Sequence, residues 1–143
     1  MRLSESKVRE LTARAEEMLQ RSYVPYSGFC VGAALLCRNG EIVTGCNIEN
    51  AAYGPSNCAE RTAIFKAVSE GITEFDAIAI VGGYDRKIGD FAPPCGVCRQ
   101  VMAEFCDPDE FLIILLNSAG ETKIMTLHEI FPESFLPGHL YRK

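Results

Sequence analysis

Two short segments of the chain place cysteines beside residues that could carry chemistry. One is the run Pro94–Cys98, which contains Cys95 and Cys98, and the other contains Cys58 and Glu60. Residues three apart at the start of a helix lie on one side of it, where free N–H groups and the helix dipole favour thiolate over thiol. Cys95 and Cys98 are therefore predicted to form half of a site for a soft metal ion such as zinc.

A third thiolate from Cys58 would leave one tetrahedral position for water, which is the pattern of catalytic rather than structural zinc. Glu60 follows two residues later, and residues two apart on a regular helix do not share a face. Cys58 and Glu60 can both reach one metal ion only if Cys58 lies at or just before the first turn. We therefore expect a helix that begins at Ala59.

The cysteine pattern by itself leaves two other interpretations open. A lone Cys-x-x-Cys pair could be a redox-active dithiol or half of a structural zinc ribbon. A structural site would need a fourth thiolate, but the remaining cysteines contain no second Cys-x-x-Cys pair. We interpret these residues as small buried hydrophobic side chains, without excluding that one is reactive. They are Cys30, Cys37, Cys46 and Cys106.

Six segments, spread along most of the chain, carry a more specific signal. They are Tyr26–Phe29, Val31–Leu35, Gly45–Ala51, Cys58–Ala63, Pro94–Gln100 and Pro132–Phe135. In this order, and with Cys-Ala-Glu followed by Pro-Cys-x-x-Cys, they resemble the small, homotetrameric, zinc-dependent cytidine deaminases of the cytidine and deoxycytidylate deaminase superfamily. One departure from that family is Cys30, where its members often carry proline or a basic residue.

The resemblance implies a role for each site residue. Cys58, Cys95 and Cys98 would bind one Zn²⁺ per subunit, and Glu60 would be the catalytic proton carrier. The residues expected to contact the substrate are Phe29, Asn47, Glu49, Tyr53, Ala59 and Phe135.

Three of these expectations have a physical basis as well as an ordinary alternative. Residues two apart in an extended segment face the same way, so Asn47 and Glu49 could present an amide and a carboxylate to a ribose diol. The alternative is a solvated polar loop. Phe29 would pack on the pyrimidine ring by resemblance, although an aromatic residue at the start of an apolar strand is more often part of the core.

A cation near the cysteines is also expected. Three thiolates would give a zinc site a formal charge of −1 and weaken it as a Lewis acid, and a nearby positive charge would restore the acidity of a bound water. Arg61 is the first candidate and Arg99 the second. For either residue the alternative is an ordinary surface charge on a helix.

The activity implied by the resemblance is hydrolytic deamination of cytidine and deoxycytidine to uridine and deoxyuridine, with release of ammonia, in pyrimidine salvage. Zinc would activate water for attack on C4, and Glu60 would carry the released proton to ring N3 and then to the leaving amino group. Two alternatives are a deaminase of another aminopyrimidine nucleoside, such as blasticidin S, and a non-catalytic zinc-stabilised binding module. Glu60 argues against the module, because a structural site has no use for a carboxylate beside an open position.

The elements that must position these residues alternate between helices and strands. Apolar residues at helical spacing predict helices over residues 5–21, 59–69 and 96–105, and a capping box of Thr126 and Glu129 predicts a short fourth helix. Apolar runs, two of them flanking the turn residues Asn39-Gly40, predict strands over residues 29–37, 42–46, 75–81, 111–116 and 122–125. We expect a single α/β domain over residues 1–143, a mixed five-stranded sheet with helices on both faces.

Composition narrows the partners. The 143 residues carry a net charge of −5 without a basic run, which argues against nucleic acid and anionic membranes. The polar start, Met1–Arg9, is unlike a secretory signal, and seven cysteines without a secretory context favour the reducing cytoplasm. A small pyrimidine nucleoside is the expected substrate. By resemblance, the protein is expected to be a homotetramer whose active sites share residues between subunits, with Phe135 crossing an interface.

Overall fold

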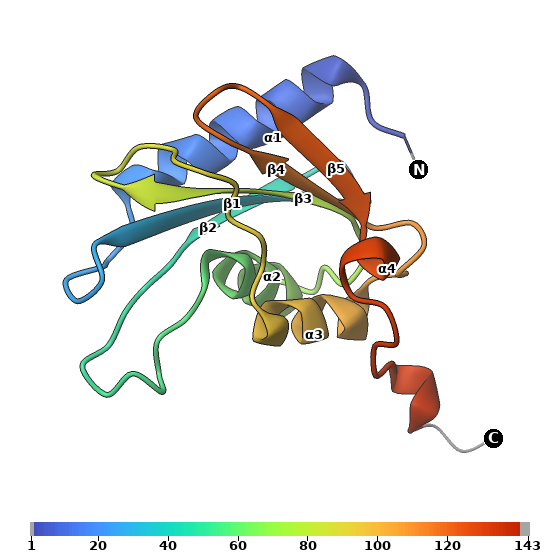
Figure 1. The fold of residues 1–143 in the computed structure, drawn as a ribbon. Coiled ribbons are helices and arrows are strands. Elements are labelled where there is room, and N and C mark those ends of the chain that lie inside the picture. Colours follow the sequence, from blue (N-terminus) through green and yellow to red (C-terminus); the bar gives the residue numbers. More distant parts are fainter. Residues whose placement is uncertain (1, 141–143) are drawn as a thin grey trace.

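A mixed five-stranded sheet with the strand order β2-β1-β3-β4-β5 organises the computed structural model, which describes residues 2–140 (Figure 1). Its strands are β1 (Phe29–Cys37), β2 (Ile42–Cys46), β3 (Phe75–Tyr84), β4 (Leu112–Leu116) and β5 (Thr122–Thr126). The β3–β4 pair is parallel, and the other three neighbouring pairs are antiparallel. The predicted mixed sheet is therefore confirmed.

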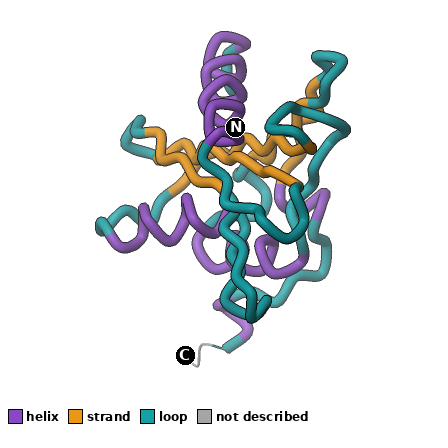
Figure 2. The backbone as a smooth tube through the Cα atoms, turned by 90° about the vertical axis from the view of Figure 1, so that its left-hand side faces the viewer, coloured by secondary structure: helices purple, strands orange, loops and turns teal. Residues whose placement is uncertain are grey.

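Helices cover both faces of this sheet, as expected. They are α1 (Glu5–Glu17), α2 (Ala59–Ser69), α3 (Gly96–Phe105) and α4 (Leu127–Ile130). α1 lies on one face, while α2 and α3 lie on the other, so the sheet is the middle layer of the molecule (Figures 1 and 2). Each interface has its own apolar core, one centred on Leu11 and Ile114 and the other on Ile64 and Ile113.

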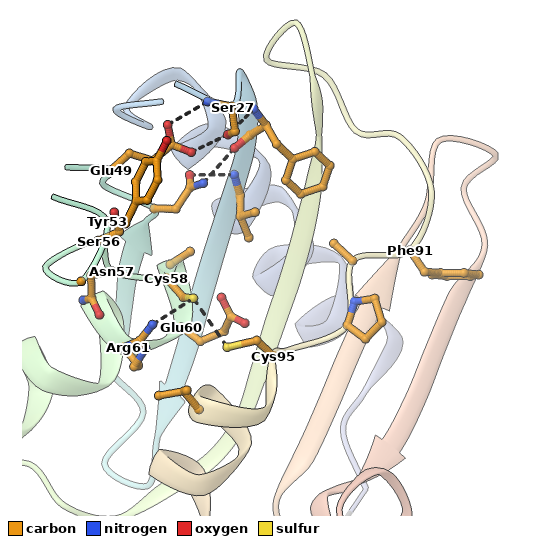
Figure 3. Close-up of a pocket in the computed structure, with 18 residues that line it drawn as sticks. Ser27, Glu49, Tyr53, Ser56, Asn57, Cys58, Glu60, Arg61, Phe91 and Cys95 are labelled. Atoms are coloured by element: carbon orange, nitrogen blue, oxygen red, sulfur yellow. Dashed lines mark hydrogen bonds between the residues drawn. The ribbon is translucent and has the colours of Figure 1, made fainter. Parts of the chain in front are cut away.

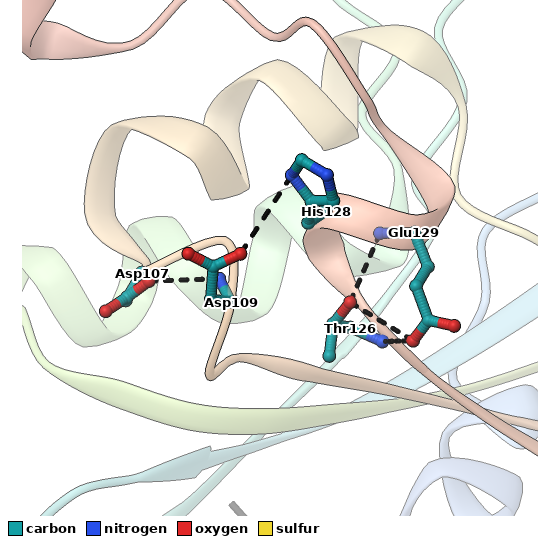
Figure 4. Close-up of polar contacts among 5 residues, drawn as sticks. All are labelled: Asp107, Asp109, Thr126, His128 and Glu129. Atoms are coloured by element: carbon teal, nitrogen blue, oxygen red, sulfur yellow. Dashed lines mark hydrogen bonds and ion pairs between the residues drawn. The ribbon is translucent and has the colours of Figure 1, made fainter.

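Local signals in the sequence account for most of the boundaries. Ser4 caps α1 by accepting a hydrogen bond from the Lys7 N–H, and Gly40 takes a positive φ of 93° in the turn between β1 and β2. Thr126 and Glu129 form the predicted capping box of α4, in which each side chain accepts a hydrogen bond from the other residue's N–H (Figure 4). The predicted bounds of α2 and α3 match the structure residue for residue.

Two elements differ from their predicted bounds. The helix expected over residues 5–21 ends as an α-helix at Glu17 and continues as a 3₁₀ turn, Met18–Gln20. β3 runs three residues beyond the expected end at Val81, because its last residues pair with the start of β1, from Val31↔Gly82 to Phe29↔Tyr84. Pairing with a neighbouring strand thus overrides the poor strand propensity of two glycines.

Within residues 2–140, no helix has the length and apolarity that crossing a bilayer requires.

Candidate active site

The first part of the site is the start of α2. Cys58 is the N-cap of this helix, with an extended backbone (φ −79°, ψ 156°), and Glu60 lies in the first turn with 4% of its surface exposed. The helix therefore begins at Ala59, as the shared metal site required. Gly45 of β2 allows the close approach of α2, since a Cβ there would lie 2.5 Å from the Ala59 carbonyl oxygen.

The second part is the start of α3. Cys95 is its N-cap, and its sulfur accepts a hydrogen bond from the Cys98 N–H at 3.4 Å. The Sγ atoms of Cys95 and Cys98 are 3.4 Å apart, and those of Cys58 and Cys95 are 3.7 Å apart. All three sulfurs lie within 4.8 Å of one another, close to the separation of about 3.8 Å that tetrahedral ligands 2.3 Å from zinc require.

The charge state of the sulfurs also suits a metal cation. Hydrogen bonding from Cys98, followed by the contact with Arg61, lowers the pKa of the Cys58 thiol to about 5. The same sharing with Cys58, together with burial, raises the pKa of Cys98. Cys58 is therefore favoured as a thiolate, the form that binds a metal cation, and the donor set of three sulfurs fits one zinc ion.

Arg61 is the cation beside the cluster. Its Nη2 donates to the Sγ of Cys58 at 3.2 Å, and its Nε is buried with no partner among the described residues. Arg99 lies elsewhere, because its guanidinium donates to the carbonyl oxygens of Pro94 and Ile130 and so ties the Cys95 loop to the end of α4. Of the two candidate arginines, Arg61 is the one that forms a hydrogen bond with a cysteine sulfur.

Glu60 is a buried carboxyl group next to these sulfurs. Burial, to which the charge of Cys58 adds, raises the pKa of Glu60 to about 7. In Figure 3 its carboxyl group lies near the side chains of Cys58 and Cys95, on the opposite side of Cys58 from Arg61. A carboxyl group with a near-neutral pKa can both accept and donate a proton at physiological pH.

A cavity of ≈ 830 Å³ opens above these groups, a size that suits a small ligand. Glu60, Cys58 and Cys95 lie at one end of it, while Glu49 and Ser27 lie at the other (Figure 3). Five of the six residues expected to contact a substrate line this cavity. They are Phe29, Asn47, Glu49, Tyr53 and Ala59.

Asn47 and Glu49 are both held by hydrogen bonds to the chain around them. The Asn47 amide accepts from the Val31 N–H at 2.9 Å and donates to the Phe29 carbonyl oxygen at 2.8 Å. The Glu49 carboxylate accepts from the Ser27 hydroxyl, from the Ser27 N–H and from the N–H of Tyr26. Hydrogen bonding to Ser27 lowers the pKa of Glu49, so this carboxylate is a fixed anion at the far end of the cavity.

Phe29 and Tyr53 present aromatic surface to the cavity. The Phe29 ring is braced edge-on by Tyr84, with 5.2 Å between the ring centroids. Tyr53 is 74% exposed and adopts a positive φ of 52° in the loop before α2. Such a conformation is uncommon for a residue other than glycine, and it places this ring at the mouth of the cavity.

Phe135 is the expected substrate contact that does not line this cavity. It is 55% exposed, stacks on His139 with 5.4 Å between the ring centroids, and is tethered through its carbonyl oxygen to the Gln100 side chain. The resemblance placed this residue in the site of a neighbouring subunit, and its position outside its own cavity is compatible with that expectation.

Several cavity residues were not singled out from the sequence, among them Ser27 and residues 91–93. Ser27 binds Glu49, and its role depends on a contact between positions 22 residues apart. Phe91, Ala92 and Pro93 line the wall next to Cys95. An apolar stretch in an otherwise polar loop, directly before the metal-ligand motif, was the signal that could have identified this wall.

Comparison with known proteins places this geometry in a family. A family model described as the cytidine and deoxycytidylate deaminase zinc-binding region matches residues 5–114. A cytidine deaminase from Sporosarcina psychrophila is 46% identical over 128 residues, covering 90% of each chain. A cytidine deaminase from Halalkalibacterium halodurans is 49% identical over 125 residues, covering 87% of this chain and 91% of that protein.

A solved structure agrees. The crystal structure of cytidine deaminase from Burkholderia pseudomallei matches with a TM-score of 0.81 and 39% sequence identity, covering 93% of this chain and all of that chain. Sequence and fold thus point the same way over most of the length of both proteins. The three-cysteine cluster, the buried glutamate and these similarities show that the chain belongs to the zinc-dependent cytidine and deoxycytidylate deaminase family.

Proposed function

We propose that this protein hydrolyses the 4-amino group of cytidine and deoxycytidine, giving uridine and deoxyuridine with release of ammonia, in pyrimidine salvage. The observation that carries the proposal is the carboxyl group of Glu60, which is buried beside three cysteine sulfurs at the floor of a cavity of ≈ 830 Å³. A structural metal site has no use for such a group. A hydrolase that must move protons between water and a leaving amine needs one.

The residues divide the reaction between them. Cys58, Cys95 and Cys98 would hold the zinc ion, which supplies Lewis acidity that activates water. Glu60 takes the proton that water loses as its oxygen attacks C4, and donates a proton to ring N3. Glu60 then transfers the proton of the new C4 hydroxyl to the amino group, the C4–N4 bond breaks as the C4 carbonyl forms, and ammonia leaves. The near-neutral pKa of Glu60, about 7, suits both directions of transfer.

The other end of the cavity would hold the sugar. Glu49 is a fixed carboxylate and Asn47 a fixed amide, and a ribose diol offers the hydroxyl donors and acceptors that both require. Phe29 would lie against the base, where aromatic surface stabilises a pyrimidine ring by stacking and burial. We assign Tyr53 and Ala59 to the wall around the nucleoside.

We further propose that the protein is a cytoplasmic homotetramer. An exposed apolar face on α2 and α3, which includes Phe65 and Val97, together with Phe135 outside its own cavity, supports a homotetramer with shared active sites. Three thiolate ligands must remain reduced, which supports a cytoplasmic location.

The decisive experiment follows the absorbance loss of cytidine with purified protein whose zinc content is measured in the same sample. Glu60→Gln should retain zinc but lose at least about 10³-fold in kcat, because an amide cannot shuttle protons. Glu70→Gln, an exposed residue at the other end of α2, is the matched control and should behave like the wild type. Absence of turnover in the zinc-loaded wild type, or normal turnover in Glu60→Gln, would contradict the proposal. Blasticidin S in the same assay tests the other aminopyrimidine substrate.

A further inference from the structure

The turn after β3 holds an unusual backbone conformation. Asp85 and Arg86 both have positive φ values, 57° and 58°, and the Lys87 N–H donates to the Tyr84 carbonyl oxygen at 3.2 Å. Two left-handed residues in a row define a tight turn that normally contains asparagine and glycine. Left-handed residues other than glycine are costly, and they persist where the surrounding structure holds them.

The contacts of Arg86 explain what holds this turn. Its Nη1 donates to the carbonyl oxygens of Leu19 at 2.7 Å and Ser22 at 3.2 Å, at the end of the 3₁₀ turn that follows α1. The Gln20 side chain donates back to the Arg86 carbonyl oxygen at 3.2 Å. A cation at a helix C-terminus satisfies carbonyl groups that the helix leaves without partners.

One of these contacts leads directly to the active site. The peptide group that joins Ser22 to Tyr23 forms hydrogen bonds through both of its polar atoms. Its C=O accepts from Arg86, and its N–H donates to the Asn47 carbonyl oxygen at 3.0 Å. The Tyr23 carbonyl oxygen then accepts from the Glu49 N–H at 2.8 Å. Ser22 is 4% exposed, so the Ser22 side of this peptide is buried.

The same turn borders a second wall of the cavity. Tyr84, directly before the turn, is the residue that braces the Phe29 ring. Gly82 lies under that ring, since a Cβ at this position would come within 3.2 Å of it. The end of β3 therefore contacts the Phe29 ring. The turn that follows is linked to Asn47 and Glu49 through Arg86 and the Ser22–Tyr23 peptide.

We propose that Arg86 is a positioning residue for the nucleoside site: by fixing the Ser22–Tyr23 peptide, it sets where Asn47 and Glu49 stand in the cavity. This inference rests on the proposed function for its kinetic consequence. Arg86 does not line the cavity. It acts on substrate binding and leaves the three sulfurs and Glu60 at the other end unaffected.

Two glycine substitutions separate the guanidinium from the backbone conformation. Arg86→Gly removes the hydrogen bonds and also relieves the positive φ, whereas Asp85→Gly relieves the neighbouring positive φ and keeps the guanidinium. Arg86→Gly should raise KM for cytidine roughly 10-fold with kcat within about 2-fold and zinc content unchanged. Asp85→Gly should match the wild type. Arg86→Lys keeps the charge and enough N–H donors for both carbonyl groups, but its side chain is shorter than that of arginine, so its KM should fall between the two.

Hydrogen exchange gives a readout that does not depend on turnover. The amides of Tyr23 and Glu49 should exchange faster in Arg86→Gly than in the wild type or Asp85→Gly, with no change in peptides from α2 and α3. Unchanged KM and unchanged exchange in Arg86→Gly would overturn the inference, as would equal defects in both glycine variants. If the wild type deaminates no aminopyrimidine nucleoside, the proposed function fails, and the exchange experiment still decides whether Arg86 holds the wall.

Discussion

At the scale of single residues, the floor of the cavity combines three cysteines and one carboxyl group with one basic side chain. Cys58, Cys95, Cys98 and Glu60 gather at the floor of the cavity, and Arg61 is the single lysine or arginine among the described residues that line it. Unpaired charges at such a buried place are costly, so the arrangement depends on cations. A zinc ion and Arg61 would together supply the positive charge that three thiolates require.

Loss of a ligand should therefore remove the metal and weaken the fold. Cys95→Ala should lose zinc and cytidine turnover and lower the melting temperature, because the metal ties two helix starts together. The measurements are elemental analysis and thermal unfolding. Cys106→Ala is the matched control at the other end of α3: it should cost about 1 kcal/mol of stability through its small cavity and keep full zinc. Full zinc and normal turnover in Cys95→Ala would reject the ligand assignment.

Arg61 should affect the rate more than metal content. Arg61→Met keeps an unbranched apolar stem but removes the hydrogen bond to the Cys58 sulfur, so the thiolate would donate more charge to the metal and weaken its acidity. We expect kcat to fall about 10-fold, equal to about 1.4 kcal/mol, with zinc retained. Lys66→Met, on the exposed part of the same helix, should have no effect. A wild-type rate in zinc-loaded Arg61→Met would assign this arginine to structure alone.

At the scale of elements, the site depends on two helix starts that are brought together by a sheet. α2 and α3 lie on the same face, and their N-caps, Cys58 and Cys95, are both extended, which turns both sulfurs towards one point. The tight approach of α2 to β2 at Gly45 fixes one of these starts. Precise placement of the ligands is therefore a consequence of helix packing.

A methyl group at Gly45 should disturb that packing. In Gly45→Ala the new Cβ would lie 2.5 Å from the Ala59 carbonyl oxygen and 2.6 Å from the Ala63 nitrogen, so the backbone of α2 has to move. We expect a loss of about 1–3 kcal/mol in the free energy of unfolding, and a lower kcat because Cys58 and Glu60 move with the helix. Gly138→Ala, where a Cβ would meet no atom within 4 Å, is the control. Equal unfolding free energies for the two variants would contradict this packing argument.

The helices and strands also show which parts of the fold could be predicted from the sequence. The bounds of α2 and α3 were predicted because caps and apolar spacing are local signals. The extension of β3 to Tyr84 and the contact of Arg86 with Ser22 were not, because they join positions far apart in the chain. The two cysteine motifs were recognised for the same local reason, and the structure brings their three sulfurs together. The walls of the cavity, such as Phe91, depend on how loops fold over the sheet and leave little trace in spacing.

At the scale of the whole molecule, several large apolar side chains are exposed on the surface of the single chain. Phe65 is 46% exposed and Val97 57% exposed, and both border a shallow groove along α2 and α3. Val97 also lines the cavity, so a partner placed on this groove would reach the edge of the active site. Assembly would then complete the site as well as bury apolar surface.

The shared site can be tested with two defective subunits. Phe135→Ala should raise KM for cytidine about 5-fold, as expected for the loss of about 1 kcal/mol of stacking, with zinc intact. Co-expression with Glu60→Gln under separate affinity tags gives hybrids in which an intact Phe135 from one subunit can serve a site with an intact Glu60 in another.

At cytidine concentrations well below KM, hybrids should therefore exceed the turnover of Phe135→Ala alone, counted per subunit that carries Glu60. If Phe135 only anchors its own tail, where it stacks on His139 and is bound by Gln100, each intact Glu60 would still lie beside its own defective residue. The hybrids would then show no gain per active subunit. A fully active monomer in light scattering would likewise exclude sharing between subunits, and it would leave the zinc chemistry of Cys58, Cys95, Cys98 and Glu60 untouched.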